Sequence, residues 1–282
     1  MAYLKQAVAG GVGYAVAGPA GALLGVALAG GDSDDAGYDM SDIPIGVHVE
    51  EQHQNDELGR RWSLHFLSEI PAPAFARVQF RNDSGQPLGG HAPFADAGGT
   101  FLAAAPIGRH NDGWRSVLYL PFGALQYTSP KHISLEVSVW SQQRGKLHPA
   151  GKGTLEANLP AATTWQPAAF LQPLVSLGAR VMMTSGQPTQ SQLATMVEYI
   201  ASEFGILGPV RASALSAMLV HANHPPPLRD TIERARFRFP NLNHTAVVAL
   251  LSEACFSDDH NATAARAALS DIATSLTEPR PQ

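Results

Sequence analysis

The hydrophobic period of this sequence changes along the chain, and the change limits which folds are open to it. In the first half apolar residues alternate with polar ones, as Ile133, Leu135 and Val137 do with the residues between them. That spacing places successive apolar side chains on one face of a β-strand. From residue 171 onward apolar residues recur at three- and four-residue intervals, the spacing of one face of an α-helix. The sequence therefore predicts a multidomain α+β protein with its strands before its helices.

The alternating part contains about seven predicted short strands. Turn-forming residues separate them, as in the Asn-Asp-Ser-Gly run at residues 82–85. Short alternating strands in this number are typical of an antiparallel β-sandwich, in which two sheets pack face to face. The strands are expected at residues 46–51, 62–66, 76–80, 100–105, 116–122, 133–139 and 152–158.

The second half predicts a bundle of helices. The best-defined helix begins with a capping box, in which Thr189 and Gln192 each satisfy a backbone N–H at the helix start, and Gly205 ends it. Its apolar residues share one stripe, which we expect to face a core. The predicted helices are at residues 171–183, 189–204, 209–222, 228–237, 244–256 and 262–276.

Two parts of this helical half resemble a known domain. The turn and capped helix at residues 183–206, and the run IERARFRFPNLNHTAVVALLSEACFSDDH at residues 232–260, are similar to TerB-like domains. These all-helical domains occur in tellurite-resistance proteins and in the N-terminal half of DjlA-type membrane-anchored co-chaperones. The resemblance covers residues 171–276, and it implies a TerB-like bundle with a role in bacterial envelope or tellurite-type stress.

The acidic motifs of that family are incomplete in this chain. Ser185 and Gln192 stand where the first motif has Asp and Glu. The second motif retains Asp258 and Asp259 but has alanines at 264–265, where a Glu is expected. A divalent cation needs several oxygen ligands, so we expect no metal site and no cofactor. The chain also lacks a J-domain and its His-Pro-Asp tripeptide, so the resemblance implies no co-chaperone activity.

The first 31 residues are apolar and rich in glycine and alanine, with Lys5 as their one charged side chain. The apolar run is long enough to span the roughly 30 Å core of a bilayer as a helix. Pro19 leaves two geometries, a kinked helix or a hairpin of two short helices. We predict membrane association, with soluble self-association as the alternative. Small residues at helical spacing let helices approach closely, and here they are Gly18, Gly21 and Gly25.

The orientation of this segment stays open. Lys5 weakly places the N-terminus in the cytoplasm by the positive-inside rule. The family resemblance instead places the body of the protein there, and we adopt this as the expected location.

Changes in composition mark two predicted linkers in the rest of the chain. Residues 32–44 are acidic and rich in small residues, and residues 160–170 are rich in Pro, Ala and Thr, so both are predicted linkers. The predicted units are therefore the apolar segment at 1–31, the linker at 32–44, the β-sandwich at 45–159, the linker at 160–170, the TerB-like domain at 171–276 and a tail at 277–282.

A basic run lies in and just after the fourth predicted helix. Its arginines are interleaved with Phe237 and Phe239. The run predicts either a surface for acidic lipid head groups or an acidic protein, or a solvated face that buries the two phenylalanines. The four arginines of this candidate partner surface are Arg229, Arg234, Arg236 and Arg238.

The other candidate metal-binding or reactive residues have simpler structural explanations. His221 and His224 are three residues apart, but no cysteine or close carboxylate completes a metal-binding set, and the helix dipole favours histidine at a helix end. The acidic residues at 258–259 are expected to cap the next helix. The single cysteine, Cys255, is expected to pack as a small apolar side chain.

Charge and motifs exclude several classes of function. The net charge of −5 provides no basic footprint for nucleic acid. The sequence has no GxSxG elbow, no GxxxxGK[ST] phosphate loop, no HExxH helix and no Rossmann fingerprint. We therefore predict a protein that is not an enzyme and has no catalytic residues.

Three functions remain as hypotheses. The first is a membrane-associated adaptor or scaffold with an unidentified protein partner. The second is a structural protein that forms a soluble homo-oligomer or filament through its glycine-rich N-terminus. The third is a hydrolase or metal-dependent enzyme whose dispersed histidines and aspartates meet between the two domains. The first is the prediction that we carry forward.

Overall fold

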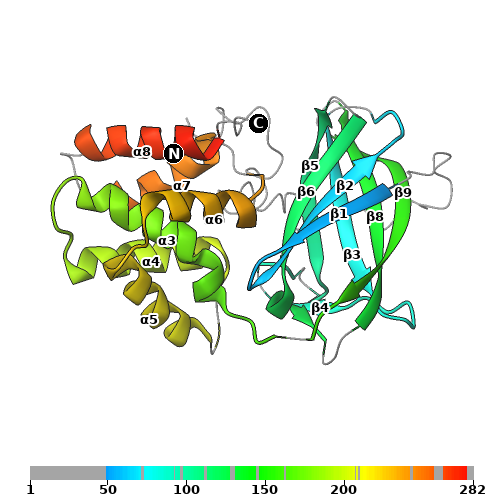
Figure 1. Cartoon of the computed structure of the whole chain (residues 1–282), viewed down its shortest axis with the longest axis horizontal. Helices are drawn as coiled ribbons and strands as arrows, with labels where there is room; N and C mark the ends of the chain where they lie inside the picture. The colour runs from blue at the N-terminus through cyan, green and yellow to red at the C-terminus, as the bar shows by residue number, and fades with distance from the viewer. Residues whose placement is uncertain are drawn as a thin grey trace.

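The chain forms a curled antiparallel sheet followed by a bundle of helices, as the computed structural model shows (Figure 1). This arrangement confirms the predicted α+β class with strands before helices. The structure describes residues 49–70, 73–91, 93–95, 98–110, 113–127, 131–143, 146–161, 163–206, 208, 210–241, 244–256 and 263–277. Residues 1–31, with Gly18, Gly21 and Gly25, and residues 32–44 lie outside this described part.

Seven strands form one continuous sheet in the order β1-β2-β6-β5-β3-β8-β9, and every neighbouring pair is antiparallel. The seven predicted strands correspond to these seven. Their bounds are Val49–Asn55 for β1, Gly59–Phe66 for β2, Ala74–Arg81 for β3, Leu102–His110 for β5, Gly113–Pro121 for β6, Lys131–Gln143 for β8 and Lys146–Leu159 for β9. A separate pair is formed by β4 (Gly89–Gly90) and β7 (Leu125–Gln126), and a short 3₁₀ turn, η3, spans Phe122–Ala124.

The predicted sandwich of two stacked sheets is therefore wrong. One sheet curls instead, and its two edge strands approach each other. Arg60 on β2 links these edges, because its Nε donates to Asn55 Oδ1 on β1 and its Nη1 to the Asn158 carbonyl on β9, both at 3.0 Å. Alternation predicts one buried face per strand in either arrangement, so it does not distinguish a curled sheet from two stacked ones.

The concave face of the sheet is filled with apolar side chains. Every second residue of β2 from Trp62 onward is buried, and the same holds for β3 and for most of β8. Trp62, Phe80 and Leu135 are among the largest side chains with no exposed surface. The interior of the curl is therefore a packed core.

Six described helices follow the sheet, and their bounds agree with the predicted ones to within four residues. They are α3 (Pro167–Met183), α4 (Gln190–Glu203), α5 (Val210–Asn223), α6 (Leu228–Arg238), α7 (His244–Phe256) and α8 (Thr263–Thr277). The largest difference is at α3, which begins four residues early, with Pro167 at the first helical position that suits proline.

The predicted capping box is present at α4. The Gln192 backbone N–H donates to Thr189 Oγ1 at 3.2 Å, and the Thr189 backbone N–H donates to Gln192 Oε1 at 2.8 Å. Gly205 takes the left-handed conformation, with a φ of +60°, just after the helix. Both ends of α4 are thus set by local sequence, as predicted.

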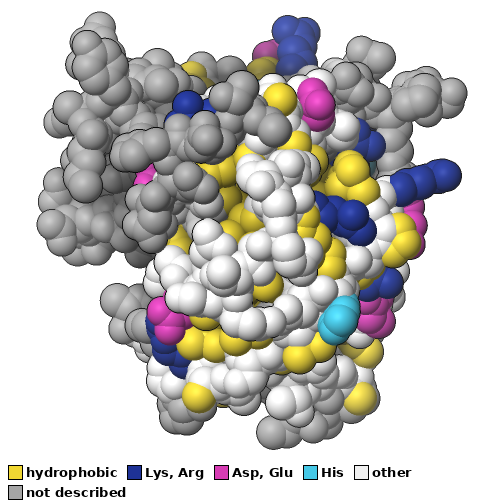
Figure 2. Space-filling view, turned by 90° about the vertical axis from the view of Figure 1, so that its left-hand side faces the viewer, with side chains coloured by type: hydrophobic (Ala, Val, Ile, Leu, Met, Phe, Trp, Pro, Cys, Tyr) yellow, Lys and Arg dark blue, Asp and Glu magenta, His cyan; other side chains and the backbone are white. Residues whose placement is uncertain are grey.

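Helix α3 lies at the centre of the bundle and contacts each of the other five described helices. Its side chains from Phe170 to Ala179 are buried on all sides. Gly178 lets α4 come close, because a Cβ at this position would lie 2.6 Å from Met196 Sδ. Figure 2 shows the outward face of the helices, with hydrophobic side chains in its middle and charged ones mostly toward its edges.

One hydrophobic core connects the sheet to the helices. A series of ring contacts runs from Trp62 to Phe80 at 6.1 Å, on to Phe101 at 5.0 Å and to Phe94 at 5.8 Å. Phe94 then contacts Phe170 of α3 at 5.5 Å. Because the rings pack without a break, the two parts should unfold together.

We expect Phe170→Ala to lower the free energy of unfolding by about 3–5 kcal/mol, because it leaves a cavity where the two parts meet. Urea denaturation measures the free energy of unfolding. Tryptophan fluorescence reports on the sheet and on the segment that precedes α3, and circular dichroism reports on the helices. Both signals should shift together. The control Val220→Ala, at a side chain that is 60% exposed, should stay within about 0.5 kcal/mol of the wild type. Two separate transitions would contradict a shared core.

Candidate functional site

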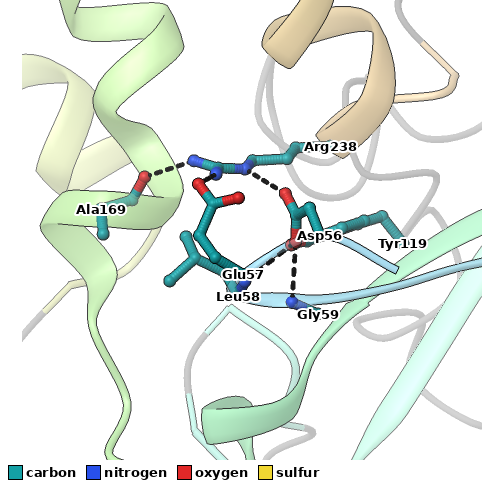
Figure 3. A network of polar contacts seen from close by, with 7 residues as sticks. All are labelled: Asp56, Glu57, Leu58, Gly59, Tyr119, Ala169 and Arg238. Carbon is teal, nitrogen blue, oxygen red and sulfur yellow. Dashed lines mark hydrogen bonds and ion pairs between the residues drawn. The ribbon is translucent and has the colours of Figure 1, made fainter. Parts of the chain in front are cut away.

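A buried polar network lies where the helices meet the sheet (Figure 3). Arg238, the last residue of α6, has a side chain that is only 2% exposed. Its Nε donates to Asp56 Oδ2 at 2.9 Å and its Nη2 to Glu57 Oε1 at 2.5 Å. Its Nη1 donates to the Ala169 carbonyl of α3 at 2.7 Å. One guanidinium thus joins α6, α3 and the turn between β1 and β2.

The turn itself is organised by Asp56. Its Oδ1 accepts hydrogen bonds from the backbone N–H groups of Leu58 and Gly59, both at 2.9 Å, which is how a short acidic side chain closes a turn. The same oxygen accepts from the Tyr119 hydroxyl of β6 at 2.6 Å. Gly59 is required here, since a Cβ would lie 2.2 Å from the Leu120 carbonyl oxygen.

Electrostatics hold these groups in one protonation state each. Burial alone would raise the pKa of Asp56, but the hydrogen bonds from Tyr119 and Arg238 and the charge of Arg238 outweigh it and lower that pKa. Burial and the adjacent carboxylate raise the pKa of Tyr119 far above its ordinary value. The carboxylate stays ionised and the phenol stays protonated near neutral pH. The network therefore suits a structural clamp better than proton transfer.

Replacing Arg238 with methionine should lower the free energy of unfolding by about 3–5 kcal/mol, because the Asp56 carboxylate then stays largely buried without its cation. Methionine keeps the apolar stem, so little packing is lost. Arg234→Met is the matched control on the same helix, where the side chain is exposed, and it should change stability by about 0.5 kcal/mol or less. Equal effects of the two substitutions in urea denaturation would exclude the clamp.

The lowered pKa of Asp56 predicts acid sensitivity at this junction. Above the ordinary value of 3.8 both the folded and the unfolded chain carry the carboxylate, so its stabilising contribution is complete. Below it the unfolded chain binds the proton first, and the contribution is lost as the pH falls toward the folded pKa. The difference in unfolding free energy between the wild type and Asp56→Asn should be constant above about pH 5 and shrink below pH 4. A difference independent of pH would contradict this assignment.

The four predicted arginines do not form one surface. Arg229 is 88% exposed and pairs with Glu233 one turn along α6 at 3.5 Å, and Arg234 is exposed as well. Arg236 turns inward and donates to the Leu276 carbonyl at the end of α8 at 3.2 Å, where the helix dipole favours a cation. Arg238 is buried in the clamp. The candidate partner surface thus keeps only its first two arginines.

The remaining predicted candidates are placed as follows. His221 is half-buried, which lowers its pKa, and His224 is exposed. Residues 258–260 lie outside the described part. Cys255 packs against the helical core, where burial raises the pKa of its thiol to about 12, and the thiol donates to the Gly178 carbonyl at 3.5 Å. Within the described residues, no group of three or more His, Cys, Asp and Glu side chains could hold a metal ion.

An open hollow lies at the end of the sheet that is distant from the clamp. Its volume is about 560 Å³, within the range that small ligands occupy. The segment after β2 and the β5–β6 hairpin form its walls. The lining residues are Phe66, Leu67, Ser68, Glu69, Arg109, His110, Gly113 and Trp114.

Neither site is predicted from the sequence, for two different reasons. Asp56 and Arg238 are 182 positions apart, and no local pattern connects them. The hollow left one signal, the Phe66-Leu67 pair, where two apolar residues follow each other at the end of an alternating strand. Such a pair puts one large apolar side chain on the solvent side, and Leu67 is 62% exposed.

No protein-family model and no curated protein matches this sequence. Of the helices in the described part of the chain, none combines the length and the apolar character needed to cross a bilayer.

Proposed function

We propose that this protein is a non-enzymatic, membrane-associated adaptor. In this proposal residues 1–31 hold the chain at a membrane, and the sheet and helices form one rigid body that a protein partner recognises. In such a body the surfaces of the sheet and of the helices keep a constant relative orientation, which a scaffold needs. The proposed location of the folded body is the cytoplasmic side of the membrane.

The observation that carries the proposal is the clamp around Arg238. Its carboxylates and its arginine satisfy one another, and Asp56 and Tyr119 are held in the protonation states that keep the clamp closed. Catalytic acids and bases need pKa values near the working pH, and these two groups are shifted away from it. The buried ionic groups therefore support a structural role, in which they hold the sheet and the helices together.

The proposed biological context rests on the resemblance to TerB-like domains. We propose that α3–α8 form a TerB-like bundle with degenerate acidic motifs, and that residues 1–31 are helical. On this basis the adaptor acts in bacterial envelope or tellurite-type stress. The capped α4 and the central α3 are compatible with this assignment.

Lipid flotation tests the proposal. The full-length protein should float with vesicles, and a chain that starts at Asp32 should stay in the dense fraction, because the apolar segment supplies most of the membrane affinity. The shortened chain should show the same urea unfolding transition as the full-length protein, which serves as the control for folding. If neither chain floats and the full-length chain alone forms large particles, the glycine-rich segment is an assembly contact. The structural homo-oligomer would then replace the adaptor.

A further inference from the structure

Strand β1 begins at the end of the sheet that carries the hollow. The first residue of β1, Val49, is paired with Phe66, and Phe66 is paired with Trp114 on β6. The turn at Asp56 lies at the opposite end and points toward the helices in Figure 1. Strand β2 runs from that turn to the hollow and spans roughly 25 Å. Val49, the first residue that the structure describes, therefore lies at the end of the sheet away from the helices.

The side chains at this end have the character of a membrane contact. Leu67 is 62% exposed, the largest fraction for a large hydrophobic side chain in the described part of the chain. Trp114, which is half-buried, and Arg109, which is exposed, line the same hollow. Aromatic and aliphatic side chains favour the interface of a bilayer, and basic side chains favour anionic head groups.

We propose that this end of the sheet rests on an anionic membrane surface, with Leu67 inserted at the head-group level and Arg109 against lipid phosphates. The inference rests on the proposed membrane function and adds the surface that faces the lipid. The hollow takes a phosphate-bearing head group between Arg109 and Trp114. The helices then face away from the membrane, toward the proposed partner.

Glu69 allows a more specific test of the proposed surface, because it places a negative charge in the same hollow. An anionic membrane attracts Arg109 and repels Glu69. Removing one charge at a time should therefore change lipid binding in opposite directions, although both substitutions are made in the same hollow.

The test measures binding of the full-length protein to two kinds of vesicle, phosphatidylcholine alone and phosphatidylcholine partly replaced by phosphatidylglycerol. Added salt should reduce the effect of each charge substitution on binding to the anionic vesicles. Arg109→Gln should weaken binding to anionic vesicles by about fivefold, and Glu69→Gln should strengthen it by about as much. Leu67→Ser should weaken binding to both kinds of vesicle by roughly fivefold.

Two substitutions on the helices serve as matched controls. Arg234→Gln removes an exposed arginine, and Val220→Ser replaces a side chain that is 60% exposed, nearly the same fraction as Leu67. Both should leave vesicle binding unchanged. If Arg234→Gln weakens binding as much as Arg109→Gln, α6 or the overall charge governs the contact, and the proposed surface is wrong.

The failures of the two proposals can be told apart. If the full-length protein binds neither kind of vesicle, both the membrane function and this surface are excluded. If it binds both kinds equally and the substitutions at Leu67, Glu69 and Arg109 have no effect, the membrane function stands and only the surface is excluded. Urea denaturation of each variant confirms that the surface substitutions leave the fold intact.

Discussion

A permanent positive charge lies where the sheet and the helices meet, and water barely reaches it. A buried guanidinium is tolerated only when hydrogen bonds and opposite charges surround it. Arg238 meets this condition through Asp56, Glu57 and the Ala169 carbonyl, which belong to two separate parts of the chain. The relative position of sheet and helices is therefore coupled to one side chain, because a different placement would separate Arg238 from these three partners.

Apolar packing supports the same geometry. Phe170 of α3 contacts Phe94 and Tyr119 on the sheet side and Phe204 and Phe239 on the helix side. Aromatic pairs at such distances add to the free energy gained from burial. The clamp contributes directional polar contacts, and the rings contribute apolar contacts. The sheet and the helices thus share one continuous core.

The distribution of polar groups separates the two ends of the sheet. At the helix end, the buried Arg238 pairs with the largely buried Asp56 and with the exposed Glu57. At the other end, Arg109, Glu69 and Leu67 are exposed around an open hollow. An exposed charge can exchange partners with solvent, lipid or ligand at little energetic cost, whereas a buried pair cannot. Polar contacts within the protein are thus concentrated at the helix end of the sheet, and groups that can form new contacts lie at the end that carries the hollow.

Local physics determined much of this protein from sequence alone. The alternation between Trp62 and Val139 predicted the strands, and the capping box at Thr189 and Gln192 predicted the start of α4, because both depend on residues that are close along the chain. Only the tertiary structure decided that the strands make one curled sheet, that Arg236 and Arg238 turn inward, and that Asp56 receives Arg238. Those outcomes depend on which distant segments share a low-dielectric environment, and hydrophobic periodicity holds no information about that pairing.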